Sequence, residues 1–350
     1  ATINTSVAAI SEAISARMNG ADFALLLPGQ DASSGFAEDI LASLIRAMES
    51  FVEGGPSVYI GIGRFARGTG LRHVLSQIDA ALITAEAESS NGIREAAIDG
   101  DDELPETNDE WAKLIRQALD RRQIRLVSFP VVDFDRRLLH EECPLRLRLD
   151  GSDEWLTAGR FLPVAEKLGM MPALDLTAIT LGLNELEARP ELPGLAINLS
   201  ASTVADSDST LAIEALLKKH RSAASRLWIE VAETGVFKHL EAFRDLCRIL
   251  RSFRCKVGVE HFGRQFSQIG QFHDLGLDYI KFDVGYIRRL ETNPGNQAFL
   301  KGAATIARGI GLQVIAEGVV SDDELNALAA VGFDGATGPG VKPAQGTIAT

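Results

Sequence analysis

Between residues 194 and 319, five short apolar runs each end in a polar side chain, and this repeat limits the possible folds more than any other feature. Short β-branched runs are typical of buried parallel strands, and the amphipathic stretches between them are typical of helices. In a (β/α)8 barrel the carboxyl ends of such strands converge on one face, where ligands bind. The sequence therefore predicts an α/β barrel with a single mouth, ringed by Asn198, Glu230, Glu260, Lys281 and Glu317.

Charge and composition restrict what such a mouth can hold. A lysine at a strand end can act as a Schiff-base nucleophile, but the carboxylates expected around Lys281 favour a ligand-binding mouth. The net charge of −13 argues against non-specific binding to nucleic acid or anionic lipid. A few local cations, or metal ions, would have to hold an anionic ligand.

The cysteines and the hydropathy pattern exclude further classes. Cys143, Cys247 and Cys255 show no CxxC spacing, which predicts a reducing compartment and neither a disulfide framework nor a zinc site. No apolar run approaches the roughly 18 residues of a membrane-spanning helix.

Residues 1–97 are predicted to form a first unit. Strands at 22–28 and 57–63 alternate with helices at 35–52 and 71–88, whose apolar residues follow a helical period. This order implies an α/β sandwich that is incomplete at its N-terminus.

An acidic, turn-rich stretch at 98–109 predicts a linker. The second unit is expected to span 110–343 and to begin with a helix at 110–122. Residues 344–350 have little to pack against and predict a loosely held tail.

The first unit carries a motif of a known family. Residues 18–28 resemble the GGDEF motif and the following strand of diguanylate cyclases, and residues 57–96 are similar to the end of that domain. An active cyclase needs two acids at this turn for Mg²⁺, and glycines for close backbone approach. The five aligned positions are Asn19, Gly20, Ala21, Asp22 and Phe23. Alanine thus replaces one acid and asparagine one glycine, so we expect a degenerate GGDEF domain without cyclase activity.

The second unit resembles the EAL domain, the fold of cyclic di-GMP phosphodiesterases, over nearly its full length. Six blocks occur in the family's order, at residues 142–147, 161–169, 198–200, 230–233, 281–283 and 316–319. The resemblance implies an EAL-type (β/α)8 TIM-like barrel behind the partial α/β sandwich.

The resemblance also implies how active members hydrolyse their substrate, with two metal ions that generate hydroxide and clamp the reacting oxygens. The family's metal ligands fall on Glu142, Asn198, Glu230 and Glu317, which we expect to be vestigial. The family's Asp-Asp pair falls on Glu260 and His261. A longer carboxylate and a neutral imidazole suit Mg²⁺ poorly. We therefore expect no catalytic residues and no bound metal.

Binding of cyclic di-GMP needs fewer intact residues than its hydrolysis does. Arg146 can form a bidentate contact with a phosphate, and Lys281 can supply a point charge. The other expected roles are apolar contact with guanine and acceptance of guanine N–H groups. The resemblance assigns these to Leu145, Phe161 and Pro163, and to Asp283 and Glu317. The whole expected binding set is Glu142, Leu145, Arg146, Phe161, Pro163, Asn198, Glu230, Glu260, Lys281, Asp283 and Glu317.

Residues 260–267 and 337–340 depart from the family pattern in a way that resembles LapD-type receptors. Those are inner-membrane proteins whose degenerate GGDEF–EAL pair reads cyclic di-GMP and signals to a periplasmic protease. The resemblance implies the cytoplasmic part of such a protein, a homodimer through the EAL domain, and a protease partner reached through N-terminal parts. The coupling loop would contain His261, Arg264 and Gln265.

Two residues keep open interpretations: Glu233 supports the site or only caps a helix, and His261 is a ligand or a supporting histidine. We expect a non-enzymatic cyclic di-GMP receptor that needs no cofactor. One alternative is a residual Mg²⁺- or Mn²⁺-dependent phosphodiesterase that produces pGpG. Another is an interaction module that has lost the ligand.

Overall fold

The computed structural model describes residues 13–19, 22–28, 34–48, 58–65, 71–86, 92–96, 105, 107–149 and 155–343. The chain separates into two compact units, residues 1–104 and 105–350. Most of the predicted linker and the predicted tail at 344–350 lie outside the described residues. Within the part of the chain that is described, no helix has the length and apolar character needed to cross a membrane.

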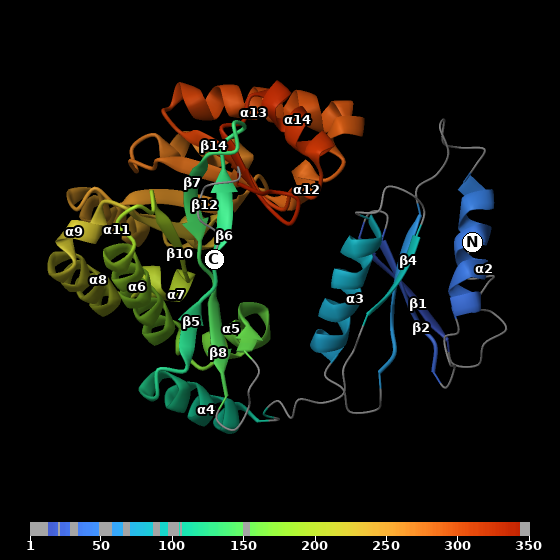
Figure 1. Cartoon of the computed structure of the whole chain (residues 1–350), viewed down its shortest axis with the longest axis horizontal. Helices are drawn as coiled ribbons and strands as arrows, with labels where there is room; N and C mark the ends of the chain where they lie inside the picture. Colours follow the sequence, from blue (N-terminus) through green and yellow to red (C-terminus); the bar gives the residue numbers. More distant parts are fainter. Residues whose placement is uncertain are drawn as a thin grey trace. The chain divides into compact units, whose positions relative to one another are not determined.

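The N-terminal unit is a small α/β region (Figure 1). Its elements are β1 (Ile14–Asn19), β2 (Asp22–Leu26), α2 (Ser34–Met48), β3 (Tyr59–Gly63), α3 (Leu71–Glu86) and β4 (Gly92–Ala96). Strands β1 and β2 pair antiparallel, whereas β3 and β4 pair parallel. Both helices contact β3 and β4. Gly61 permits the close approach of α3, because an added Cβ would lie 2.5 Å from the carbonyl oxygen of Ile78.

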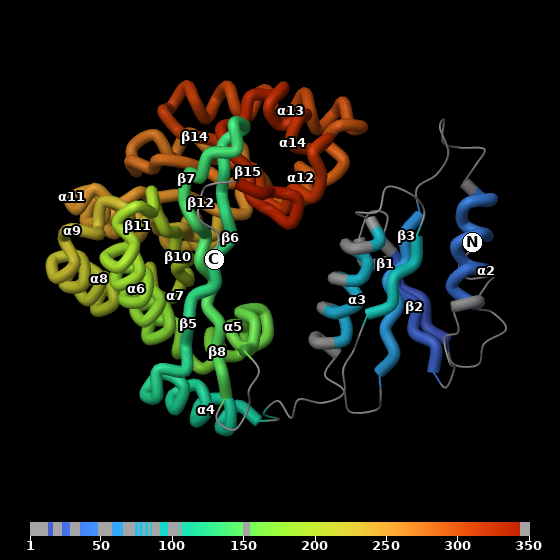
Figure 2. The backbone as a smooth tube through the Cα atoms, in the orientation of Figure 1, coloured from blue at the N-terminus to red at the C-terminus, as the bar shows by residue number. Residues whose placement is uncertain are grey.

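The second unit contains the predicted barrel, closed in the order β10-β11-β12-β13-β14-β15-β6-β7 (Figure 2). Its strands are β6 (Phe129–Val132), β7 (Leu138–Glu142), β10 (Leu195–Leu199), β11 (Leu227–Ala232), β12 (Lys256–Phe262), β13 (Tyr279–Phe282), β14 (Gln313–Ala316) and β15 (Gly335–Thr337). Five of them coincide with the polar-ended apolar runs.

One strand of the barrel is antiparallel to its neighbours, whereas all eight strands of a regular (β/α)8 barrel are parallel. Strand β6 pairs antiparallel with both β7 and β15. The connection from β6 to β7 is only residues 133–137, and a parallel crossover needs about a dozen residues or more. Asp133 closes this turn, because its carboxylate accepts from the backbone N–H of Arg137 at 2.8 Å.

Helices cover the outside of the barrel. They are α6 (Met171–Ala188), α7 (Ala201–Ala205), α8 (Ser207–Lys219), α9 (Arg221–Ala224), α10 (Glu233–Lys238), α11 (Leu240–Ser252), α12 (Val284–Ile287), α13 (Pro294–Gly309) and α14 (Asp322–Val331), with 3-10 turns η1 (Phe266–Phe272) and η2 (Leu290–Thr292). In α11 the apolar residues Phe243, Leu246, Cys247 and Leu250 recur every three or four positions and are fully buried. Each such large side chain contributes about 1.5–3 kcal/mol.

A three-stranded antiparallel sheet stands beside the barrel. It consists of β5 (Ile124–Leu126), β8 (Leu145–Arg148) and β9 (Trp155–Thr157), next to α4 (Asn108–Asp120) and α5 (Ala158–Lys167). Ile124, Leu147 and Leu156 on its inner face are buried. Because β8 follows β7 after only two residues, this sheet is tied to the mouth of the barrel.

Candidate functional site

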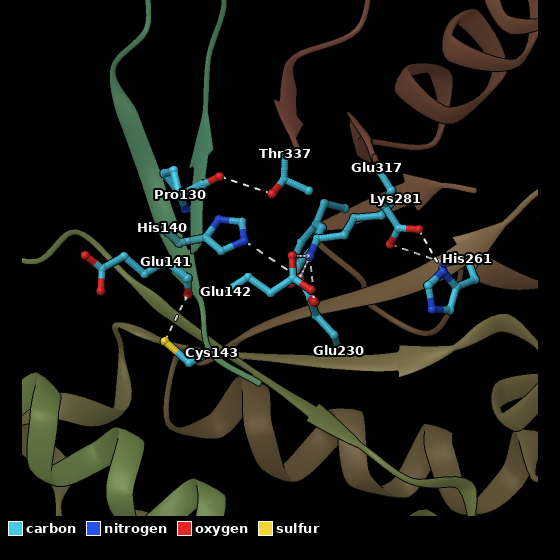
Figure 3. A network of polar contacts seen from close by, with 11 residues as sticks. Pro130, His140, Glu141, Glu142, Cys143, Glu230, His261, Lys281, Glu317 and Thr337 are labelled. Carbon is cyan, nitrogen blue, oxygen red and sulfur yellow. Dashed lines mark hydrogen bonds and ion pairs between the residues drawn. The ribbon is translucent and has the colours of Figure 1, made fainter. Parts of the chain in front are cut away.

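The strand ends bring the predicted polar residues together (Figure 3). Glu142 ends β7, and Glu317 directly follows β14. Asn198 and Glu230 are register partners on β10 and β11, and Glu260 and Lys281 lie on β12 and β13. Glu230 and Lys281 are fully buried, and Glu260 and Glu317 are each 8% exposed. A concentration of buried charge at one end of the barrel marks this as the candidate site.

Lys281 is the positive centre of this cluster. Its Nζ lies 2.6 Å from Oε1 and 2.7 Å from Oε2 of Glu230, and 3.1 Å from Oε2 of Glu142. Burial alone would lower the pKa of Lys281, but the charges of Glu230 and Glu142 outweigh burial and raise it. Burial alone would likewise raise the pKa of Glu230, but Lys281 holds it well below its usual range. The pair is therefore ionised.

Two aromatic residues and a histidine form the floor beneath this pair. The Tyr279 hydroxyl donates to Oε1 of Glu230 at 2.7 Å. The ring of His140 stacks on Trp228, with ring centroids 4.0 Å apart, and its Nε2 lies 3.7 Å from Glu230. Tyr279 and His140 are not among the site residues predicted from the sequence. Each precedes a predicted site residue by two positions on the same strand and so shares its face, which was the available signal.

Three carboxylates form a cluster that fits a divalent cation. Single oxygens of Glu142, Glu230 and Glu260 lie within 4.8 Å of one another. Burial, and then the charges of Glu230 and Glu317, raise the pKa of Glu260 to about 8. The Asn198 Oδ1 is buried and, within the described residues, has no hydrogen-bond donor. A hard cation takes such oxygen ligands, so the three clustered carboxylates could hold one Mg²⁺ or Mn²⁺, with Asn198 beside Glu230 on the neighbouring strand.

His261 prevents the same fit for a second cation. Its Nδ1 lies 2.8 Å from Oε2 of Glu317, and its backbone N–H points to Oε1 of the same carboxylate at 3.5 Å. The His261 side chain is 59% exposed, and its hydrogen bond to Glu317 raises its pKa to about 9 although desolvation acts to lower it. An imidazolium therefore pairs with Glu317 at a position where the resemblance led us to expect a carboxylate. The backbone of His261 is left-handed, with φ of 53°, a conformation that costs about 1–2 kcal/mol outside glycine.

Glu233 links the site to the predicted coupling loop. It begins α10 and is 1% exposed. Its Oε1 accepts from the backbone N–H groups of Gly263 and Gln265, both at 3.0 Å. Arg264 between them is exposed. Glu233 thus stands at a helix start and also holds the loop that follows β12.

Arg146 lies outside this cluster, on β8 of the three-stranded sheet. Its Nη1 donates to the backbone oxygen of Leu145 at 3.1 Å, and the residue is half-buried. Asp283 caps α12, where one carboxylate oxygen accepts from the Gly285 N–H at 2.8 Å. Pro163 is half-buried within α5.

Two apolar residues of the predicted set are buried, and their contact with a guanine stays a prediction. Phe161 is fully buried and Leu145 is 7% exposed. Both pack inward from α5 and β8, so neither ring nor side chain offers a face to a guanine in this conformation. In the N-terminal unit, Asn19 ends β1 and Asp22 begins β2, while Phe23 is 53% exposed. Gly20 and Ala21 of the predicted turn lie outside the described residues.

Comparisons with known proteins identify relatives of this barrel. The sequence profile of the EAL domain family matches residues 112–344, well over half of the chain. The RNase E specificity factor CsrD of Escherichia coli (strain K12) is 27% identical over 335 residues, which are 93% of this chain and 50% of CsrD. The cyclic di-GMP phosphodiesterase PdeF of the same strain is 25% identical over 224 residues, or 63% of this chain and 30% of PdeF.

A solved structure has the same architecture. LapD of Vibrio cholerae, comprising its S helix, GGDEF and EAL parts and bound to cyclic di-GMP, superposes with a TM-score of 0.63 at 21% identity. The match covers 94% of this chain and 79% of that one, and at this identity it shows the fold. The chain spans half or less of the length of the two curated relatives.

Proposed function

The chain belongs to the EAL domain family, and from this premise we propose that its barrel binds cyclic di-GMP at the mouth without hydrolysing it. The observation that carries the proposal is the ion pair between His261 and Glu317. The resemblance implies that hydrolysis needs two cations, which hold the attacking and the leaving oxygens. The residues present fit one cation, which Glu142, Glu230 and Glu260 would hold beside Asn198 and which would polarise a phosphate oxygen when bound.

A second cation would have no comparable set of free ligands. Glu317 already accepts a hydrogen bond from His261, which leaves fewer of its lone pairs for a metal ion. An imidazole is also a weaker partner for Mg²⁺ than the carboxylate it replaces. The site thus keeps three clustered carboxylates but has no second ligand set of the kind that two-metal cleavage requires among the described residues.

The remaining groups suit a phosphodiester ligand. Arg146, half-buried and without an ion pair among the described residues, can bind a phosphate through two N–H groups. Asp283 has a second carboxylate oxygen, for which no hydrogen bond is seen among the described residues, and we propose that it accepts from a guanine N–H. We propose that Arg146 supplies much of the affinity.

We further propose that occupancy is transmitted through the loop after β12. His261, which lies at the mouth, is two residues from Gly263, and Gly263 is held by Glu233 and by the hydroxyl of Tyr286 at 3.0 Å. A ligand shifts such a loop only if it binds two loop conformations with different affinity. By the resemblance to LapD-type receptors, this shift would control autoinhibition, dimerisation and signalling to a periplasmic protease and biofilm adhesion. The chain would then be the cytoplasmic part of an inner-membrane protein.

The alternative is residual phosphodiesterase activity, which the three clustered carboxylates favour, together with the Asn198 oxygen that has no hydrogen-bond donor among the described residues. In that case Mg²⁺ or Mn²⁺ would be required and pGpG would be released.

Calorimetric titration with cyclic di-GMP in EDTA, and again in Mn²⁺, tests both functions. The recovered ligand is then analysed by chromatography. We expect saturable binding in EDTA and intact ligand after incubation with either metal. The variant His261→Asp restores the family's carboxylate and should bind Mn²⁺ more tightly than the wild type. Release of pGpG by the wild type would establish the alternative, and absence of binding heat would leave an interaction module.

A further inference from the structure

The outer face of the three-stranded sheet is strongly basic. Alternate residues of its strands point to opposite faces. The inner face is apolar and buried, with Ile124, Leu145, Leu147 and Leu156. The outer face carries Arg125, Arg146, Arg148, Trp155 and Thr157, all of which are exposed or half-buried. We call these five residues the arginine face.

Register places like charges directly against each other on this face. Arg125 on β5 is the partner of Arg146 on β8, and Arg148 is the partner of Trp155 on β9. Burial, and then the charge of Arg125, lower the pKa of Arg146. Within the described residues, none of Arg125, Arg146 and Arg148 forms an ion pair with a carboxylate.

Like charges at directly opposed positions destabilise a sheet. The chain has 48 acidic and 35 basic residues, so acids to neutralise this face are abundant in its composition. Among the residues that the structure describes, no carboxylate offsets this conflict, and local conflicts of this kind are expected at functional surfaces. An anion bound between the arginines would remove the conflict.

The aromatic residue indicates what kind of anion this is. The guanidinium carbon of Arg125 lies 4.2 Å from the ring centroid of Trp155, and that of Arg148 lies 5.3 Å from it. The ring therefore holds both guanidinium groups across its surface. Nucleic-acid bases stack on aromatic rings and on such guanidinium planes, while neighbouring arginines contact the phosphates.

We propose that the arginine face binds single-stranded RNA. A polymer suits an open sheet surface, whereas small ligands usually occupy concave pockets. Binding is local and limited, because the net charge of −13 opposes it elsewhere on the chain. This site is distinct from the proposed cyclic di-GMP mouth except for Arg146, which stands at the border of the two.

The test is titration of the whole chain with an oligouridylate of about ten nucleotides, within the roughly 4–16 nucleotides that single-strand sites cover. Tryptophan fluorescence provides a direct signal, because Trp155 is half-buried whereas Trp111 and Trp228 are 6% and 9% exposed. We expect saturable quenching at low salt that Trp155→Phe abolishes. The logarithm of the affinity should fall with the logarithm of the salt concentration by about 0.7 per phosphate contacted.

The decisive variant is Arg125→Ser combined with Arg148→Ser. It should weaken RNA binding by about tenfold or more and reduce the salt slope by about 1.4. Cyclic di-GMP affinity should remain unchanged. The matched control, Arg221→Ser combined with Arg248→Ser, makes the same change in net charge on exposed positions of α9 and α11 and should bind RNA like the wild type.

Three outcomes overturn the proposal. They are absence of RNA binding at low salt, equal loss of RNA binding in the test and control variants, and preferential binding of an acidic peptide or of anionic phospholipid vesicles over the oligouridylate. If the wild type does not bind cyclic di-GMP, that result would instead contradict the proposed function and would leave the RNA result unaffected.

Discussion

Replacing Lys281 with methionine tests whether the buried ion pair in the barrel behaves as its geometry implies. Methionine keeps most of the length of the side chain but removes the charge that lies 2.6 Å from Glu230. Glu230 is fully buried and keeps the hydroxyl of Tyr279, at 2.7 Å, as a hydrogen-bond donor, with Nε2 of His140 3.7 Å away. Removing one partner of a buried pair typically costs about 3–5 kcal/mol.

Protonation of Glu230 sets the size and the pH dependence of that loss. Without Lys281, desolvation raises the folded-state pKa of Glu230 above its unfolded value of 4.5. The folded variant then keeps a proton that the unfolded chain releases, so its stability falls as pH rises. Between pH 4.5 and 7 this amounts to about 3.4 kcal/mol, at about 1.36 kcal/mol per pH unit. The wild type, with a depressed Glu230 pKa, loses this residue's contribution only in more acidic solution.

Urea unfolding followed by tryptophan fluorescence is the appropriate assay, because Trp111, Trp155 and Trp228 all lie in the barrel unit. We expect Lys281→Met to be about 3–4 kcal/mol less stable at pH 7, and this deficit to shrink toward pH 4.5. The double variant Glu230→Gln, Lys281→Met is the control and should lack the pH dependence. A deficit below about 1 kcal/mol at pH 7, or one that grows on acidification, would refute the reasoning.

Three further predictions concern the mouth and its loop. Arg146→Ala should weaken cyclic di-GMP binding by about 1.5–3 kcal/mol in calorimetry, the value of a charged hydrogen bond; an unchanged affinity would remove Arg146 from the site. Glu233→Gln should accelerate amide hydrogen exchange of Gly263 and Gln265 by about tenfold, with unchanged exchange showing that the loop holds itself. Glu260 has a raised pKa of about 8, so wild-type stability should decline as pH rises from about 4.5 to 8. Glu260→Gln should therefore gain about 3–4 kcal/mol relative to the wild type between pH 5 and pH 8 in urea unfolding, and a constant difference would contradict the shift.

Much of the fold could be predicted because buried strands have a simple sequence pattern. The runs that end at Asn198, Glu230, Glu260, Lys281 and Glu317 became or adjoin barrel strands, since strands buried on both faces are continuously apolar. Strand β1 and the reversed direction of β6 were not foreseen. Strand β1 lacks a sustained apolar run. The direction of β6 relative to β7 follows from the short turn between them, which is too short for a parallel connection.

The chemistry at the site was less predictable than the positions of its residues. The resemblance pointed to His261 as a replaced carboxylate, but only the folded chain shows its ring bonded to Glu317. Phe161 was expected to face a ligand, yet it is fully buried, because the helical face on which it lies turns inward. Side-chain direction depends on how elements pack, which a linear motif does not specify.

The sequence by itself determined that this chain forms an EAL-type barrel with a polar mouth, because strand periodicity and motif order are local properties. Tertiary structure alone decided which charges meet. It paired Lys281 with Glu230 and His261 with Glu317, and it set Arg125 against Arg146. These partners are separated by 51, 56 and 21 positions along the chain. Coulomb interactions depend on distance in space and on local burial, and both are fixed only when the barrel closes.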